Sequence, residues 1–137
     1  MSNIEETQIE FIAFKGIKFT IEWYYGENKK SQSKDYFESL DENRKISTLN
    51  LFKLMGNIGQ IRNKEKFNFE GDGIYAFKPQ PDRFLCFFQK GQKIIVTNGF
   101  HKKQDKLPVS EKDRALKARA SYFERLERGN YYESFEK

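Results

Sequence analysis

Hydrophobic and polar side chains alternate regularly through residues 17–23 of the chain. A period of two is typical of a β-strand with one buried face and one exposed face. An apolar-rich run at residues 9–14 precedes this segment, and Lys15-Gly16 between the two runs is typical of a tight turn. The pattern therefore predicts an N-terminal β-hairpin.

The spacing of apolar side chains becomes helical after the polar stretch at residues 26–33. It predicts a short helix over residues 34–40 and a second helix that begins at Asp41, a favourable N-cap residue. A broad apolar stripe along the second helix indicates that this helix packs against a core. We expect Gly56 or Gly59 to end it.

Four strand-like runs follow, at residues 67–70, 74–78, 83–89 and 93–100. Within the third of these, residues 84–88 are apolar without interruption. An uninterrupted apolar run indicates a central strand that is covered on both faces.

A last helix is predicted after Pro108 and is expected to end at Gly129. Ser110 with Asp113 resembles a capping box, in which two side chains satisfy the first backbone N–H groups of a helix. The order of elements then predicts the fold class. We expect one α+β domain over residues 1–137, with a mostly antiparallel, twisted sheet on which two helices from the N-terminal half and one C-terminal helix pack.

The composition agrees with one folded, soluble domain. Aromatic residues make up 16% of the 137 residues and charged residues 33%, which is enough for a core and for a solvated surface. No apolar run approaches the roughly 18 residues of a membrane span, and no secretory signal is visible. Cys86, the single cysteine, cannot form an internal disulfide. We therefore expect a cytoplasmic protein that does not associate with membranes.

Positive charge is concentrated in one part of the chain. Residues 1–70 contain eleven basic and eleven acidic side chains, whereas residues 78–106 contain seven basic and two acidic ones. The second segment thus accounts for the whole net charge of +5. Such a concentration indicates a phosphate-binding face, although an ordinary solvated surface has a similar composition.

The motifs of several common enzyme classes are absent from the sequence. It contains no GxxxxGK[ST] phosphate loop, no GxGxxG turn and no GxSxG elbow. The single histidine excludes an acid–base pair of two histidines, and the scarcity of acids in residues 78–106 argues against a carboxylate-bound metal. Lysine and arginine can stabilise negative charge that develops on a phosphate, and RNA supplies its own nucleophile in the 2′-hydroxyl. A ribonuclease without metal or cofactor is therefore chemically reasonable.

Several segments, taken in order, resemble the HigB-type toxins of the RelE/ParE toxin–antitoxin superfamily, in its phage-derived branch. Residues 99–108 read Gly-Phe-His-Lys-Lys-Gln-Asp-Lys-Leu-Pro, where that family has Gly-Phe-x-Lys-Lys-x-x-x-x-Pro before a helix rich in Ala and Arg. Residues 83–88 resemble its arginine-led apolar strand, and residues 74–78 its apolar-Tyr-Glu-Leu-Arg strand. The resemblance covers about residues 17–128, so the first strand and the tail after Gly129 are additions.

This resemblance implies an α+β fold of the RelE type and an endoribonuclease that cuts messenger RNA, usually on the ribosome. It also implies a cognate helix-turn-helix antitoxin as a partner. Carried over by position, the catalytic candidates are Lys78, Arg83, Lys102 and Lys103. Among these, Arg83 is expected to stabilise the negative charge of the transition state, and Lys78 to be a second clamp or a group that moves a proton. The further candidates for RNA binding are Lys90, Lys93, His101 and Lys106.

The sequence departs from the family at Ala76-Phe77-Lys78, where family members have Glu-Leu-Arg. The change removes a carboxylate and replaces the bidentate fork of arginine by the point charge of lysine. Two alternatives therefore stay open. One is an inhibitor of DNA gyrase like the ParE toxins, and the other is a non-catalytic module that binds RNA or an antitoxin.

Overall fold

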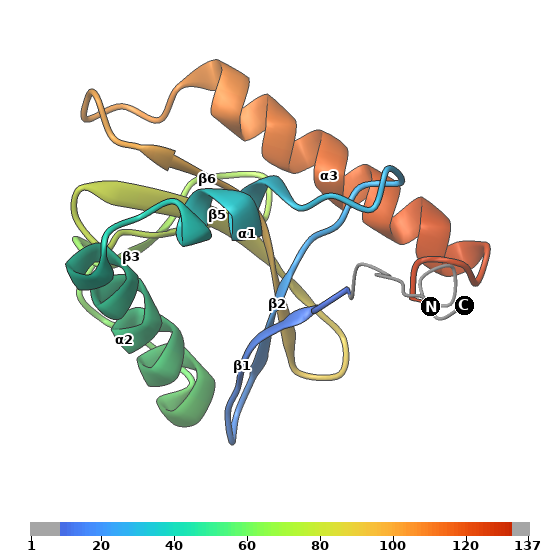
Figure 1. Ribbon diagram of the computed structural model, residues 1–137, viewed down its shortest axis with the longest axis horizontal. Helices are drawn as coiled ribbons and strands as arrows, with labels where there is room; N and C mark the ends of the chain where they lie inside the picture. Colours follow the sequence, from blue (N-terminus) through green and yellow to red (C-terminus); the bar gives the residue numbers. More distant parts are fainter. Residues whose placement is uncertain (1–8, 133–137) are drawn as a thin grey trace, which may run out of the picture.

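A six-stranded sheet forms the centre of the computed structural model, which describes residues 9–132 (Figure 1). From one edge to the other, the strands are Ile12–Lys15 (β1), Thr20–Trp23 (β2), Lys93–His101 (β6), Asp82–Gln89 (β5), Tyr75–Phe77 (β4) and Phe67–Phe69 (β3). Neighbouring strands are antiparallel except β2 and β6, which run parallel. The predicted N-terminal hairpin and the mostly antiparallel sheet are confirmed.

Helices cover both faces of the sheet (Figure 1). Helices α1 (Gln32–Glu38) and α2 (Glu42–Ile58) lie on one side, and α3 (Val109–Glu127) lies on the other. Phe52 and Met55 of α2 are buried in one apolar cluster, whereas Ala115 and Tyr122 of α3 are buried in a second. The predicted α+β class is therefore confirmed, and the sheet separates two cores.

Strand β5 contributes to both cores. Phe84 and Cys86 belong to the cluster under α2, and Leu85 and Phe87 belong to the cluster under α3. All four side chains are at most 1% exposed, which confirms the central strand predicted from the apolar run. Burial also raises the pKa of the Cys86 thiol, so this cysteine is an inert core residue.

Local signals determine both ends of α2. The Asp41 side chain accepts a hydrogen bond from the Arg44 backbone N–H at 2.9 Å, as predicted for an N-cap. Gly59 ends the helix in a left-handed conformation with φ of 91°, which glycine adopts without strain. Gly56 lies inside the helix, where a Cβ atom would come within 2.7 Å of the Phe14 ring on β1. Gly56 thus serves close packing, and Gly59 serves termination.

The starts of the other two helices differ from the predictions. Helix α1 begins at Gln32 because the Ser31 side chain caps it, accepting a hydrogen bond from the Lys34 N–H at 3.2 Å. The predicted capping box at the start of α3 does not form. Pro108 occupies the N-cap position without a side-chain hydrogen bond, so Ser110 already lies inside the first turn.

The regular alternation of residues 17–23 does not produce one buried and one exposed face. Ile17, in the turn before β2, is 81% exposed, whereas Glu22 within β2 is 5% exposed. The Tyr132 hydroxyl donates a hydrogen bond to one Glu22 oxygen at 2.7 Å, and Lys93 Nζ lies 3.5 Å from the other. Glu22, which was predicted to face solvent, is therefore covered by Tyr132 and Lys93, whereas Lys18 on the same face stays exposed.

The chain turns back on the domain after α3. Gly129 follows the helix with φ of 72°, which confirms the predicted end. Tyr131 is 1% exposed, and its hydroxyl accepts a hydrogen bond from the Tyr25 N–H at 3.0 Å. Residues 133–137 of the predicted tail lie outside the described residues. None of the helices found within residues 9–132 is long and apolar enough to span a membrane.

Candidate functional site

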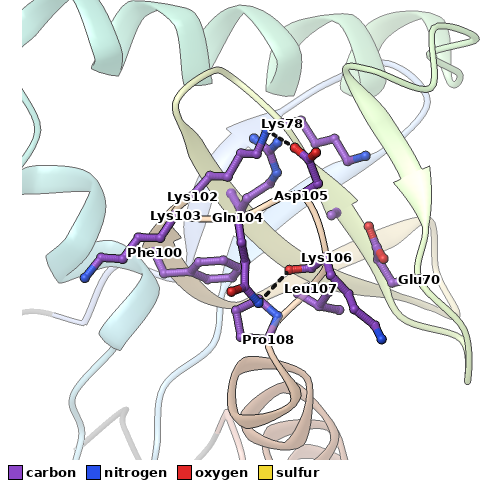
Figure 2. Close-up of a pocket in the computed structure, with 12 residues that line it drawn as sticks. Glu70, Lys78, Phe100, Lys102, Lys103, Gln104, Asp105, Lys106, Leu107 and Pro108 are labelled. Atoms are coloured by element: carbon purple, nitrogen blue, oxygen red, sulfur yellow. Dashed lines mark hydrogen bonds and ion pairs between the residues drawn. The ribbon is translucent and has the colours of Figure 1, made fainter.

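A pocket opens where the last residues of β6 and the loop at residues 102–108 meet the beginning of β5 (Figure 2). We call it the basic pocket, and it is lined by Glu70, Ala76, Lys78, Arg83, Phe100, Lys102, Lys103, Gln104, Asp105, Lys106, Leu107 and Pro108. Its volume is about 30 Å³, which leaves room for a small group and not for a whole nucleotide. The four catalytic candidates and Lys106 all line it.

Strand pairing places the basic side chains close together. Arg83 on β5 is directly opposite Phe100 on β6, and the backbone N–H of Lys102 donates to the Pro81 carbonyl oxygen at 2.8 Å. Lys78 follows directly after β4, the strand that pairs with β5 on its other side. Three adjacent strands therefore each place one basic residue in the lining of the pocket, and the Lys78 Nζ also donates to the Lys64 carbonyl oxygen at 3.4 Å.

The Arg83 guanidinium is held from within its own strand and turn. Its Nη1 donates to the Asp82 carbonyl oxygen at 2.9 Å and approaches Gln80 Oε1 at 3.4 Å. Burial lowers the pKa of Arg83 from its ordinary value, although arginine stays charged at neutral pH. Among the ion pairs found within residues 9–132, none includes Arg83. Its charge is therefore available to an anion.

Lys102 is paired with an acid of its own loop. Its Nζ lies 2.9 Å from Asp105 Oδ1, and this hydrogen bond holds the pKa of the Asp105 carboxyl below its usual range (Figure 2). The Asp105 side chain is fully exposed, so the pair contributes little to stability. A phosphate that enters the pocket can replace Asp105 at Lys102 at small cost.

The basic pocket also contains Glu70, which follows β3 and was not identified from the sequence. It accepts a hydrogen bond from Asn68 Nδ2 at 3.5 Å, and its charge acts on Arg83. The sequence gives no signal for it, because an acid before a glycine turn is common on any surface. Ala76, which stands where the family has Glu, lines the same pocket at 1% exposure. Glu70, which follows β3, therefore supplies the pocket with a carboxylate that the alanine at position 76 on β4 cannot supply.

The remaining candidates lie elsewhere. Lys90 and Lys93 flank the turn at the other end of the β5–β6 hairpin, roughly 20 Å along the strands from Arg83. Lys93 has a structural role, because its Nζ contacts the Glu22 carboxylate and donates a hydrogen bond to the Tyr132 hydroxyl at 3.1 Å. His101 does not line the basic pocket but faces a neighbouring one.

A buried network supports the strand that carries Arg83. The Asp82 side chain is 0% exposed and forms an ion pair with Arg44 of α2 at 2.6 Å. The Tyr36 hydroxyl of α1 donates to the same carboxylate oxygen. Burial, together with this hydrogen bond, raises the pKa of Tyr36, and the contact with Asp82 raises that of Arg44. Asp82 is the first residue of β5 and lies between Pro81 and Arg83, where the sequence is typical of a turn, so no local pattern indicates this network.

No group of three or more His, Cys, Asp or Glu side chains within residues 9–132 is placed to hold a metal ion. What the described residues offer is a set of basic side chains with two nearby carboxylates, Glu70 and Asp105, of which Asp105 is paired with Lys102. Such a set can bind a phosphate and stabilise additional negative charge on it.

Comparison with known protein families gives a match. The model of the family described as phage derived protein Gp49-like (DUF891) matches residues 35–120, which is more than half of the chain. The matched range runs from α1 into α3 and contains every residue that lines the basic pocket. No curated protein matches the chain.

Proposed function

The chain belongs to the Gp49-like family of phage-derived proteins, a family of the RelE type, and from this membership and its basic pocket we propose that it is a toxin that cleaves messenger RNA. The observation that supports the proposal is that Lys78, Arg83 and Lys102, from three adjacent strands, line one small pocket. Cations fixed in this way favour a phosphorus that gains negative charge in the transition state.

The proposed reaction uses the 2′-hydroxyl of the RNA as the nucleophile. Its oxygen forms a bond to the adjacent phosphorus, and the bond from phosphorus to the 5′-oxygen breaks. The products are a 2′,3′-cyclic phosphate and a 5′-hydroxyl. One proton leaves the 2′-hydroxyl and one is taken up by the 5′-oxygen, so protons and charge balance.

We assign Arg83 to the phosphate, because its charge has no partner among the described ion pairs and its fork can bind two oxygens. Lys102 is the second clamp, and Lys78 supplies the proton to the leaving 5′-oxygen. Glu70 accepts the proton of the 2′-hydroxyl, since the other carboxylate in the pocket is bound to Lys102. Lys103 and Lys106 hold the flanking RNA.

The proposal includes the cellular setting of such toxins. The substrate is messenger RNA on the ribosome, the compartment is the cytoplasm, and the partner is a helix-turn-helix antitoxin that blocks the pocket or its approach. A second candidate is a non-catalytic RNA-binding module. It is favoured by one observation, the alanine at position 76 in place of a carboxylate.

The test is primer extension on a defined message in a reconstituted bacterial translation reaction. Wild type is compared with Arg83→Ala and with Lys90→Ala, a matched control that removes a charge far from the pocket. We expect new 5′ ends with wild type and Lys90→Ala but not with Arg83→Ala. Equal cleavage by Arg83→Ala contradicts the site assignment. An intact message with folded wild type removes the nuclease and favours the binding module.

The chemistry of the ends tests the mechanism separately. Attack by the 2′-hydroxyl leaves 5′-hydroxyl ends, which polynucleotide kinase labels without prior phosphatase treatment. A message with 2′-deoxy sugars at the cut position is expected to stay intact. Ends that carry a 5′-phosphate, or cleavage of the deoxy-substituted message, would show that water attacks instead.

A further inference from the structure

A second pocket lies beside the basic pocket, and we call it the side pocket. Its volume is about 480 Å³, within the range of about 300–1,000 Å³ that holds small ligands. Phe100, Lys103, Gln104 and Pro108 line both pockets. The two pockets are therefore neighbours that share these residues at the end of β6, and the side pocket is the larger.

The side pocket is open because β6 extends beyond its neighbour. The β2 strand pairs with β6 only as far as Val96, which leaves the outer edge of residues 97–101 without a strand partner. Gln32 covers part of this edge, since its side-chain amide donates to the Gly99 carbonyl oxygen and accepts from the Gly99 N–H, both at 2.8 Å. A Cβ atom at Gly99 would lie 2.9 Å from the Tyr36 ring. The wall is thus formed by close-packed groups that are already hydrogen-bonded.

The side chains around the pocket are those that bind a flat heterocycle. Tyr36, Phe100 and His101 all line it, and aromatic rings of this kind stack on nucleobases. The His101 side chain is exposed, so it is free to move onto a ligand. A pocket that bound only the phosphates and sugars of RNA would not need aromatic side chains, because these groups do not stack on rings.

Glu111 gives the side pocket a negative group that a backbone site would avoid. It lies in the first turn of α3, and its Oε1 accepts a hydrogen bond from Asn98 Nδ2 at 3.0 Å and lies 3.9 Å from Arg114 Nη1. A carboxylate repels phosphates but accepts hydrogen bonds from N–H groups on base edges. Lys103, which also lines the pocket, is a donor. An acceptor beside a donor matches guanine, whose N1–H and N2 amino group stand next to its O6.

We infer that the side pocket binds the base next to the scissile phosphate and that Glu111 selects guanine over uracil. Uracil has carbonyl oxygens on both sides of its single N–H. These oxygens would be repelled by the Glu111 carboxylate, because both groups are negative acceptors. The inference rests on the proposed function, because it takes the occupant of the basic pocket to be an RNA phosphate. The inference adds Glu111 to the proposed site as the residue that determines base preference.

The test measures binding, not cleavage. Dinucleotides with a 2′-O-methyl group, which cannot be cut, carry G or U on either side of the phosphate, and their dissociation constants are measured by calorimetry. With wild type, guanine on one side is expected to bind about tenfold more tightly than uracil. Glu111→Gln retains an oxygen for the Asn98 hydrogen bond and is expected to reduce that ratio to below about threefold. Its affinity for the all-uracil dinucleotide should change little.

Arg83→Ala serves as the matched variant for the phosphate. This variant is expected to weaken the binding of all dinucleotides by a similar factor and to leave the ratio of the dissociation constants for guanine and uracil unchanged. Equal affinity for guanine and uracil in wild type, together with weakening by Arg83→Ala, overturns the base pocket and leaves the phosphate site intact. Affinities that do not respond to Arg83→Ala instead remove the proposed function.

A second measurement does not depend on any variant being folded. In wild type, the ring protons of Tyr36 and His101 are followed by NMR while the guanine dinucleotide is added. Stacking is expected to shift both rings, and the all-uracil dinucleotide is expected to shift them less at equal concentration. Unchanged rings at saturation contradict the side pocket as the base site.

Discussion

The buried Asp82 carboxylate and the Arg44 guanidinium meet through two contacts, Nη2 to Oδ1 at 2.6 Å and Nε to Oδ2 at 3.0 Å. Both contacts join α2 to the beginning of β5, one residue before Arg83. The Tyr36 hydroxyl adds α1 to the same carboxylate. The position of Arg83 therefore depends on the Asp82 carboxylate, which does not line the pocket, because α1 and α2 both hydrogen-bond to the strand at Asp82.

Asp82→Asn is expected to lower the free energy of unfolding by about 1–3 kcal/mol, because the Tyr36 hydroxyl and the guanidinium lose a charged acceptor in a buried position. The measurement is urea unfolding followed by circular dichroism. Asp105→Asn is the matched control, since that carboxylate is fully exposed. Equal unfolding midpoints for the two variants would show that the network contributes little.

Asp105→Asn itself is expected to strengthen RNA binding by about twofold to fivefold at low salt. The change releases Lys102 from its partner and removes a negative charge that repels phosphate. Fluorescence anisotropy with a short, uncleavable RNA gives the dissociation constant. The gain should shrink as salt is raised, since exposed charges are screened. Weaker binding would instead show that Asp105 holds the loop in the shape that RNA needs.

The stability of the protein is expected to fall above pH 10. Burial and the hydrogen bond to Asp82 raise the pKa of Tyr36, and burial and hydrogen bonds to Tyr122 and Glu22 raise that of Tyr132. A raised pKa in the folded state means that the unfolded chain loses these protons first. The stabilisation is therefore complete below the unfolded pKa of 10.0 and is lost as pH rises above it.

Urea midpoints at pH 8, 10 and 11 measure this loss. Each tyrosine with a raised pKa contributes at most about 1.4 kcal/mol per pH unit above 10. Tyr36→Phe has no proton to lose at this position, so its midpoint should fall less steeply with pH than that of wild type. Parallel slopes would show that Tyr36 ionises in the folded protein as it does in the unfolded chain.

Lys93→Ala and Lys90→Ala are expected to behave differently although both remove a charge from the same hairpin. Lys93→Ala leaves the buried Glu22 without its cation and should lower the free energy of unfolding by about 1–3 kcal/mol. Lys90→Ala should change it by less than about 0.5 kcal/mol, as most surface substitutions do. Neither variant should alter RNA cleavage at a temperature where both are folded. A cleavage defect in Lys90→Ala would extend the RNA contact to this end of the hairpin.

The sequence by itself determined the elements of this protein. The N-cap at Asp41, a helix end at Gly56 or Gly59 and the central strand at residues 84–88 were predicted because each depends on neighbours within a few residues, and the structure places the end at Gly59. The basic segment also indicated which part of the chain carries the pocket. Within it, proximity in sequence grouped Lys90 and Lys93 with Lys102, although the strands separate them.

Only the tertiary structure decided which side chains meet. The parallel pairing of β2 with β6, the burial of Glu22 beneath Tyr132 and the arrival of Glu70 beside Arg83 all join residues that are far apart in the chain. Such contacts follow from how the sheet is ordered and which helix covers each face, and no local periodicity encodes them. The residue types in the sequence therefore indicated the chemistry of the site, whereas the fold decided which residues belong to it.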